Sequence, residues 1–322
     1  MQHNNTIVIA GAGVFGTAMA ERLSWNRNNT VILWSIEEDV VRDINRNHRN
    51  TKYFPTHFLN TSIRATGDKA IFSSADCILL VIPSKAIVSF TAEIKTLTKE
   101  DCMVINLAKG MSDDGAFITE QIPFRRTASM KGPTFAIEVL HGLPTAFTFG
   151  GKREDYLDFK SSILPETGLY LDFTQDIRSV ELMSILKNMY AIAIGLVSGR
   201  FNSPNVDFLI YTKAVNEMRR FLSLFECETE TIFRYCGIGD LGLTSLNDLS
   251  RNRTLGLLMG KGFSMEGGEK SATVIEGSRT VKLMGEMTRE KDVSEQFPLV
   301  QALYRLMYEK ESLNEYMQAA FS

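Results

Sequence analysis

Three glycines near the N-terminus have the spacing of a dinucleotide-binding turn. Gly11, Gly13 and Gly16 follow a strand-like apolar run at residues 6–10 and open a helical pattern. In such a turn the first glycine permits a tight bend, the second lets the backbone approach a pyrophosphate, and the third allows close helix packing. The free N–H groups at the helix start then bind the diphosphate. We therefore predict a dinucleotide site here, with a ligand-free glycine turn as the alternative.

The end of the second predicted strand carries the residue that would contact the adenosine ribose. The chain there runs Leu33-Trp-Ser-Ile-Glu37. A carboxylate at this point accepts a hydrogen bond from a ribose 2′-hydroxyl and repels a 2′-phosphate, so Glu37 favours NAD(H). Arg42, Arg46 and Arg49 leave NADP(H) open, and a solvated acidic helix start is an equally simple interpretation of Glu37.

Two further strand ends carry residues that can meet a ligand. Lys109 follows the apolar run at residues 103–107, and Gly132-Pro-Thr134 follows the run at 127–130. Ligands of α/β proteins bind at the carboxyl ends of the strands, so the lysine, a hydroxyl and backbone N–H groups would face one crevice. A solvated lysine is the plain alternative.

An apolar helical pattern from residue 181 onwards is interrupted by Lys187 and Asn188. Its apolar stripe predicts one buried side, with these two residues displaced from it. A partly desolvated lysine can exchange protons near neutral pH, which the reduction of a ketone by hydride requires. Snorkelling is the alternative. Asp240 lies in a glycine-bracketed turn, where it can hold a substrate hydroxyl, orient Lys187, or make only a local turn bond.

The segment Ser250-Arg251-Asn252-Arg253 directly precedes a helical run. Ser250 is a natural N-cap, which puts both arginines in the first turn. Two cations there oppose the helix dipole unless an anion is bound. We therefore predict a phosphate site, because the N–H groups of the helix start and a guanidinium would both donate to the anion.

The first half of the chain has the pattern of a scaffold that brings strand ends to one edge. Short apolar runs alternate with helical segments, which is typical of a doubly wound parallel sheet buried on both faces. From about residue 180, long amphipathic segments replace the strands. We predict an α/β chain, with a Rossmann-type dinucleotide-binding domain at 1–179 and an all-helical substrate-binding and catalytic domain at 180–322. The predicted strands are 6–10, 30–34, 77–82, 103–107, 127–130 and 145–149.

The composition argues against several other classes of protein. A formal net charge of −3 gives no general attraction to nucleic acid or to an anionic membrane. The longest apolar stretch, at 185–197, contains Lys187 and Asn188 and is too short to span a bilayer, and no signal peptide is visible. The cysteines and histidines lack metal-ligand spacing, so we expect buried free thiols and no metal.

Taken together, these residues resemble the bacterial-type NAD(P)-dependent glycerol-3-phosphate dehydrogenases over nearly the whole chain. The resemblance implies a Rossmann domain followed by a helical domain, with the substrate in the cleft between them. It rests on seven segments in the family's order, which are 11–18, 109–110, 132–136, 186–188, 239–241, 250–253 and 274–277.

The resemblance also implies the reaction. Hydride would pass directly between C4 of the nicotinamide of NAD or NADP and C2 of the substrate, interconverting dihydroxyacetone phosphate and sn-glycerol 3-phosphate. Lys187 would exchange the proton of the C2 oxygen, with Lys109 and Asp240 fixing its orientation. Family members typically supply glycerol phosphate for phospholipid synthesis, which implies a cytoplasmic homodimer.

The same resemblance assigns the contacts. The substrate would be contacted by Lys109, Gly132, Thr134, Lys187, Asp240, Ser250, Arg251 and Asn252. The cofactor would be contacted by Gly11, Gly13, Val14, Phe15, Gly16, Lys109, Ala136, Arg251, Val274 and Glu276.

Three departures from the family pattern bear on the hold on a 2′-phosphate and on substrate choice, and two other functions stay open. Ile36 stands where the family often has a basic residue, and segments 197–204 and 207–214 differ from the family's pattern. A related two-domain dehydrogenase for another phosphorylated or carboxylated hydroxy compound is the first alternative. A non-catalytic nucleotide-binding protein is the second, although it would need the glycines but not Lys187, Asp240 or Arg251.

Overall fold

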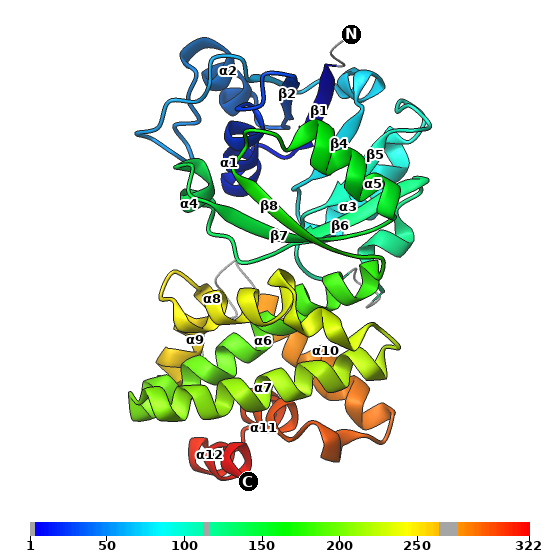
Figure 1. The fold of residues 1–322 in the computed structure, drawn as a ribbon. Helices are drawn as coiled ribbons and strands as arrows, with labels where there is room; N and C mark the ends of the chain where they lie inside the picture. The colour runs from blue at the N-terminus through cyan, green and yellow to red at the C-terminus, as the bar shows by residue number, and fades with distance from the viewer. Residues whose placement is uncertain (1–3, 112–115, 264–275) are drawn as a thin grey trace. The chain divides into compact units, whose positions relative to one another are not determined.

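The chain divides into two compact units, Met1–Glu181 and Leu182–Ser322, whereas the sequence pattern put the boundary at 179/180. The computed structural model describes residues 4–111, 116–263 and 276–322. Unit 1 is an α/β sheet structure and unit 2 is helical (Figure 1). The predicted fold class is confirmed.

Unit 1 is built on a sheet of eight strands among the described residues, in the order β3-β2-β1-β4-β5-β6-β7-β8. The first six positions have the order of a Rossmann dinucleotide-binding sheet. The strands are β1 (Asn5–Ala10), β2 (Asn29–Trp34), β3 (Arg64–Thr66), β4 (Cys77–Leu80), β5 (Met103–Asn106), β6 (Arg126–Lys131), β7 (Thr145–Gly150) and β8 (Leu169–Thr174).

The sheet departs from the sequence prediction in two ways. It is mixed rather than parallel, because β7 pairs antiparallel to β6, with Ser129 opposite Gly150. Two strands were also missed. β3 has only three residues, and β8 alternates apolar residues with the exposed Tyr170, as an edge strand does, instead of forming a continuous apolar run.

Helices cover both faces of this sheet (Figure 1), since residues along each strand alternate between two cores. Ile7 and Ile9 of β1 belong to one core, which α1, α2 and α4 complete; Val8 and Ala10 belong to the other, which α3 completes. The helices of this unit are α1 (Val14–Leu23), α2 (Glu38–Asn47), α3 (Ser84–Ile94), α4 (Ala136–Leu140) and α5 (Arg153–Asp158).

Unit 2 consists of helices, with no strand among its described residues. Its first helix, α6, begins within the last residues of unit 1. The helices are α6 (Ile177–Phe201), α7 (Pro204–Leu224), α8 (Asp240–Leu246), α9 (Arg251–Gly260), α10 (Glu276–Glu290), α11 (Pro298–Tyr308) and α12 (Leu313–Phe321).

Helix α6 is the core of the helical unit. It is longer than the apolar stretch suggested, and its length and composition would allow it to cross a membrane, but its apolar window is entirely buried within the protein. The sequence predicted that this helix would bury only one side, and that prediction was wrong because the middle of α6 is buried all round. Helices α7, α8, α9 and α10 each contact α6, so it has no solvent-facing side along its middle.

Candidate active site

In unit 1, the turn between β1 and α1 requires glycine at two positions. Gly11 has φ +116°, and a Cβ there would lie 2.8 Å from the carbonyl oxygen of Val81. A Cβ at Gly16 would lie 1.9 Å from the carbonyl oxygen of Gly11. At Gly13 a Cβ would meet no described atom within 4 Å, and the first turn of α1 has no side-chain cap and no acidic residue. The turn therefore fits an approaching diphosphate.

Asn50, which the sequence did not single out, supports this turn from the loop after α2. Its Nδ2 donates to the carbonyl oxygen of Ala12 at 2.9 Å and to Oγ1 of Thr17 at 2.8 Å. Of the two predicted cofactor contacts that begin α1, Val14 is 45% exposed and Phe15 packs partly against the core. Val14 is thus the one that mainly faces solvent.

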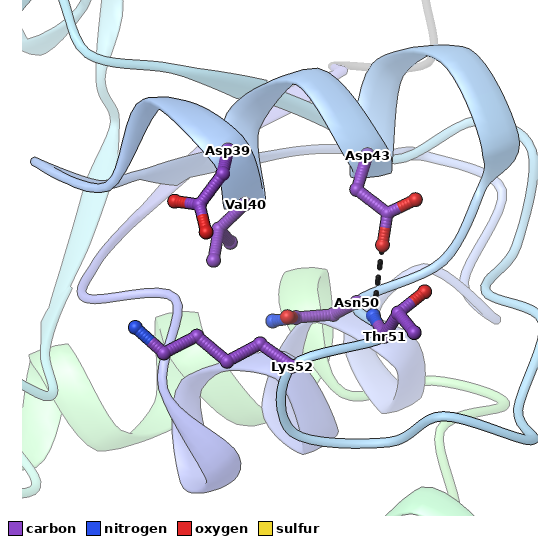
Figure 2. Close-up of a pocket in the computed structure, with 6 residues that line it drawn as sticks. All are labelled: Asp39, Val40, Asp43, Asn50, Thr51 and Lys52. Atoms are coloured by element: carbon purple, nitrogen blue, oxygen red, sulfur yellow. Dashed lines mark hydrogen bonds between the residues drawn. The ribbon is translucent and has the colours of Figure 1, made fainter.

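Glu37 is the N-cap residue of α2, and two side chains of the following loop hold its carboxylate. Lys52 Nζ donates to it at 2.7 Å and the Tyr53 hydroxyl at 3.1 Å. Lys52 also lines a pocket beside α2 together with Asp39 and Asp43 (Figure 2). Carboxylates therefore predominate where β2 ends and α2 begins.

The loops after β5 and β6 carry the other predicted residues of unit 1. Lys109 lies three residues beyond β5, and the next residue, Gly110, has φ +104°, which favours glycine. A Cβ at Gly132, just after β6, would lie 2.3 Å from the carbonyl oxygen of Ala146. Because β1, β4, β5 and β6 run parallel, these loops and the glycine turn share one edge of the sheet. Thr134 and Ala136 follow on that edge, at the start of α4.

In unit 2, Lys187 and Asp240 form an ion pair that is closed to solvent. Their side chains are 0% and 2% exposed. Lys187 comes from the middle of α6, and Asp240 is the first residue of α8 rather than part of an open turn. Breaking such a pair leaves a buried charge, at a cost of about 3–5 kcal/mol, whereas an apolar pair would fold as well. The buried ion pair is therefore better explained by a role in a functional site than by a contribution to the stability of the fold.

Glycines on two helices bring the start of α9 beside α6. Each Cβ built on them would lie between 2.1 and 2.4 Å from a backbone carbonyl oxygen of the opposite helix. The helices can approach this closely only because no side chains intervene. In the sequence, the two glycines of each helix are four residues apart, and this spacing could have indicated the close packing of the two helices. These glycines are Gly195 and Gly199 on α6, and Gly256 and Gly260 on α9.

A chain of polar contacts then joins α6, α9 and α10. Asn252 Nδ2 donates to Oδ1 of Asn188 at 3.1 Å, and its own Oδ1 accepts the backbone N–H of Gly277 at 3.1 Å. Asn188 in turn donates to Glu276 at 3.3 Å. Asn188 therefore belongs to the same cluster as the predicted residues Asn252 and Glu276.

Ser250 and the two arginines have different roles at the start of α9. Ser250 Oγ accepts the N–H of Arg253, which confirms the predicted N-cap. Arg253 donates to the carbonyl oxygen of Ser245 at 2.6 Å and pairs with Asp248, so it is satisfied within the protein. Arg251 is exposed at the first position of the helix. Of these two arginines, Arg251 is thus the one that is exposed to an anion from solvent.

The unusual segment 197–214 makes contacts that hold the helices of unit 2 together. Ser198 Oγ donates to Asp207 at 2.6 Å, the Tyr211 hydroxyl to the carbonyl oxygen of Ile238 at 2.7 Å, and Lys213 Nζ to that of Ala320 at 2.8 Å.

The structure assembles the predicted residues into two sets. Unit 1 brings one set to a single sheet edge, namely Gly11, Gly13, Val14, Phe15, Gly16, Lys109, Gly132, Thr134 and Ala136. Unit 2 gathers Lys187, Asp240, Ser250, Arg251, Asn252 and Glu276 around α6 and the start of α9. The predicted cofactor contact Val274 lies outside the described residues. The sheet edge and the buried lysine pair define the class of two-domain dinucleotide-dependent dehydrogenases.

Comparison with known proteins narrows this class. Residues 6–157 match the model for the NAD-dependent glycerol-3-phosphate dehydrogenase N-terminus, and residues 176–318 match the model for its C-terminus. The chain therefore belongs to the NAD-dependent glycerol-3-phosphate dehydrogenase family.

Individual relatives agree with this assignment. The chain is 32% identical to a glycerol-3-phosphate dehydrogenase [NAD(P)+] of Methanothermobacter thermautotrophicus, covering 97% of this chain and 96% of that protein. It is 31% identical to one of Erythrobacter litoralis, covering 94% and 91%. The crystal structure of a Coxiella burnetii glycerol-3-phosphate dehydrogenase is 27% identical and superposes with a TM-score of 0.84, covering 98% of each chain.

Proposed function

We propose that this protein interconverts dihydroxyacetone phosphate and sn-glycerol 3-phosphate by direct hydride transfer, and so supplies glycerol phosphate for phospholipid synthesis. The observation that carries the proposal is the buried Lys187–Asp240 pair, together with the Asn188–Asn252 contact at the start of α9. Bound NAD(P)H supplies the hydride to C2 of the ketone.

Lys187 is the group proposed to exchange a proton with the C2 oxygen. Reduction leaves negative charge on that oxygen, and an ammonium held in place can neutralise it by donating a proton. Asp240 forms an ion pair with this ammonium and is proposed to fix its position. Lys109 is proposed to bind the substrate alongside it, since a second cation also stabilises the developing charge.

Arg251 and Asn252 are proposed to bind the phosphate of the substrate. Ser250 caps the helix, and Arg251 is exposed next to it, so a guanidinium and the N–H groups of the helix start are available to one anion. Gly132 and Thr134 are proposed to add a backbone N–H and a hydroxyl.

NAD(H) is the coenzyme we propose. Glu37 is held by Lys52 and Tyr53 where the adenosine ribose is expected, and Ile36 beside it is 83% exposed and carries no charge. A fixed carboxylate accepts from a 2′-hydroxyl and repels a 2′-phosphate. A higher kcat/KM with NADPH than with NADH would contradict this preference.

The deciding experiment is oxidation of NADH and NADPH with dihydroxyacetone phosphate, with unphosphorylated dihydroxyacetone as the control. Turnover with the phosphate ester alone supports the proposed reaction. Turnover with the unphosphorylated ketone, or with a hydroxy acid in the reverse direction, would point to the related dehydrogenase instead. Coenzyme binding without any turnover would indicate a non-catalytic protein.

A homodimer in the cytoplasm is the proposed setting. The four cysteines are buried, and we propose that they are thiols in a reducing compartment. Unit 2 exposes aromatic side chains, including Phe208 and the contacting pair Phe201 and Phe321, which a second copy would cover. Light scattering that gives the mass of a monomer would contradict the dimer.

A further inference from the structure

A buried polar cluster lies at the carboxyl ends of β5 and β6, outside the residues assigned above. Its members are Asn106, Thr119, Lys131 and Glu181, with residue exposures of 0%, 8%, 3% and 1%. Asn106 ends β5, Lys131 ends β6 and Glu181 comes from the first turns of α6, all within unit 1. Burying a carboxylate and an ammonium is costly, so the cluster needs an explanation.

Glu181 is the centre of this cluster. One carboxylate oxygen accepts Nδ2 of Asn106 at 2.5 Å, and the other accepts Oγ1 of Thr119 at 3.0 Å. Burial raises the pKa of Glu181, and the nearby Lys131 opposes that rise. Lys131 Nζ also donates to the carbonyl oxygen of Asn106 at 2.7 Å, so both buried charges are tied to the same asparagine.

The side chain of Asn106 connects Glu181 to the loop that carries Lys109. Its Oδ1 accepts the backbone N–H of Ala108 at 3.0 Å, which is an Asx turn immediately before the lysine. The Glu181 oxygen accepts from Nδ2 of Asn106, which holds the NH2 side of the amide towards Glu181 and leaves the amide oxygen towards Ala108. Without Glu181 the amide could rotate and the turn would lose its bond.

We propose that Glu181 is a positioning residue for the reaction, acting through Asn106 to hold Lys109 in place for the substrate. The proposal rests on the proposed function, in which Lys109 binds the substrate. Glu181 itself touches no reacting atom. Glu181 restricts the loop after β5 to one conformation. If Lys109 were displaced, we expect the substrate to bind more weakly and in a less favourable orientation.

A double-mutant cycle tests this role. Glu181→Ala should raise the KM for dihydroxyacetone phosphate about tenfold or more, because the Asn106 amide is left without its hydrogen-bond partner. The Kd for NADH should stay within about twofold, and Glu181→Gln, which can keep the bond to Asn106, should be intermediate. In a Lys109→Ala background, Glu181→Ala should change KM by less than about twofold, because the residue it positions is gone.

Thr119→Val is the matched control, since it removes a hydrogen bond to the same carboxylate at a similarly buried place without touching Asn106. It should leave KM unchanged even where it lowers the melting temperature. Additive effects of Glu181→Ala and Lys109→Ala, or an equal rise in KM for Thr119→Val, would overturn the proposal in favour of a purely structural role.

A spectroscopic measurement decides the question without turnover. Reductive methylation with ¹³C-formaldehyde labels lysines, and Lys109→Arg identifies the resonance of Lys109. We expect Glu181→Ala to shift and broaden that resonance and Thr119→Val to leave it in place. An unchanged resonance in Glu181→Ala would refute the positioning role. If the wild-type protein fails to reduce dihydroxyacetone phosphate, the proposed function is lost, but this measurement still tests the link to Lys109.

Discussion

The candidate sites of the two units are built from different parts of the chain. Unit 1 offers backbone: glycines at Gly11 and Gly16 shape a turn, and Gly13 leaves space for a ligand. Unit 2 offers side chains, with Lys187 and Asp240 paired out of contact with water. The comparison teaches that the turn proposed to bind the coenzyme depends on glycines without side chains, whereas the pair proposed to exchange a proton depends on charges whose surroundings are fixed by packing.

The largest expected effect is on the charged pair. Lys187→Met should lower kcat by about a hundredfold or more, because the proposed proton donor at the C2 oxygen is lost. The measurement is NADH oxidation under saturating dihydroxyacetone phosphate, with circular dichroism to verify folding. Lys213→Met is the control, since Lys213 is a lysine of the same unit that lies outside the proposed site and donates to the carbonyl oxygen of Ala320. Wild-type kcat in Lys187→Met would remove the catalytic role.

The next effect separates two glycines of unit 1. Gly16→Ala should lower both the melting temperature and the affinity for NADH, because its Cβ would lie 1.9 Å from a backbone oxygen. Gly13→Ala should leave the melting temperature unchanged and raise the Kd for NADH about tenfold, since the methyl group would occupy space that the ligand needs. Thermal unfolding and fluorescence titration measure the two quantities. Unchanged affinity in Gly13→Ala would place the diphosphate elsewhere.

A third comparison separates the two arginines of α9. Arg251→Ala should raise the KM for dihydroxyacetone phosphate about tenfold, because a charge-assisted phosphate contact is removed. Arg253→Ala should mainly lower the melting temperature, since Arg253 is bonded to Ser245 and Asp248 within the protein. The reverse pattern would assign the phosphate to Arg253.

The smallest effect concerns a buried carboxylate of unit 2 that lies outside the proposed site. Glu217 on α7 accepts the N–H groups of Leu299 and Val300 and the Tyr190 hydroxyl, and burial raises its pKa to about 7. The folded protein therefore holds this proton more tightly than the unfolded chain. Its contribution to stability is present below the ordinary glutamate pKa and is lost as pH rises through about 7.

The melting temperature should consequently fall by a few degrees over that pH range, and less in Glu217→Gln, which stays neutral. Differential scanning calorimetry at several pH values measures the difference between the two proteins. A parallel pH dependence in both would show that Glu217 does not titrate in this range.

The sequence was most informative where local rules apply. The buried strands of the Rossmann half follow from continuous apolar runs, and the Ser250 cap follows from its position before a helical run. Strands β3 and β8 were missed, because a three-residue strand and an edge strand with partial burial give weak signals. Strand β7 was predicted at 145–149 but with the wrong direction, since direction depends on the connection and not on the residues of the strand.

The sequence by itself determined the glycine turn after β1, the helical second half and the identity of the polar residues, because glycine spacing and periodicity are local properties of a chain. Only the tertiary structure decided that Lys187 is buried on every side, that Asn50 and Glu181 support the loops of unit 1, and that Arg253 and not Arg251 is satisfied internally. These are consequences of contacts between residues far apart in sequence. Burial and hydrogen-bond partners, which set the state and direction of a charged group, exist only once the chain has folded.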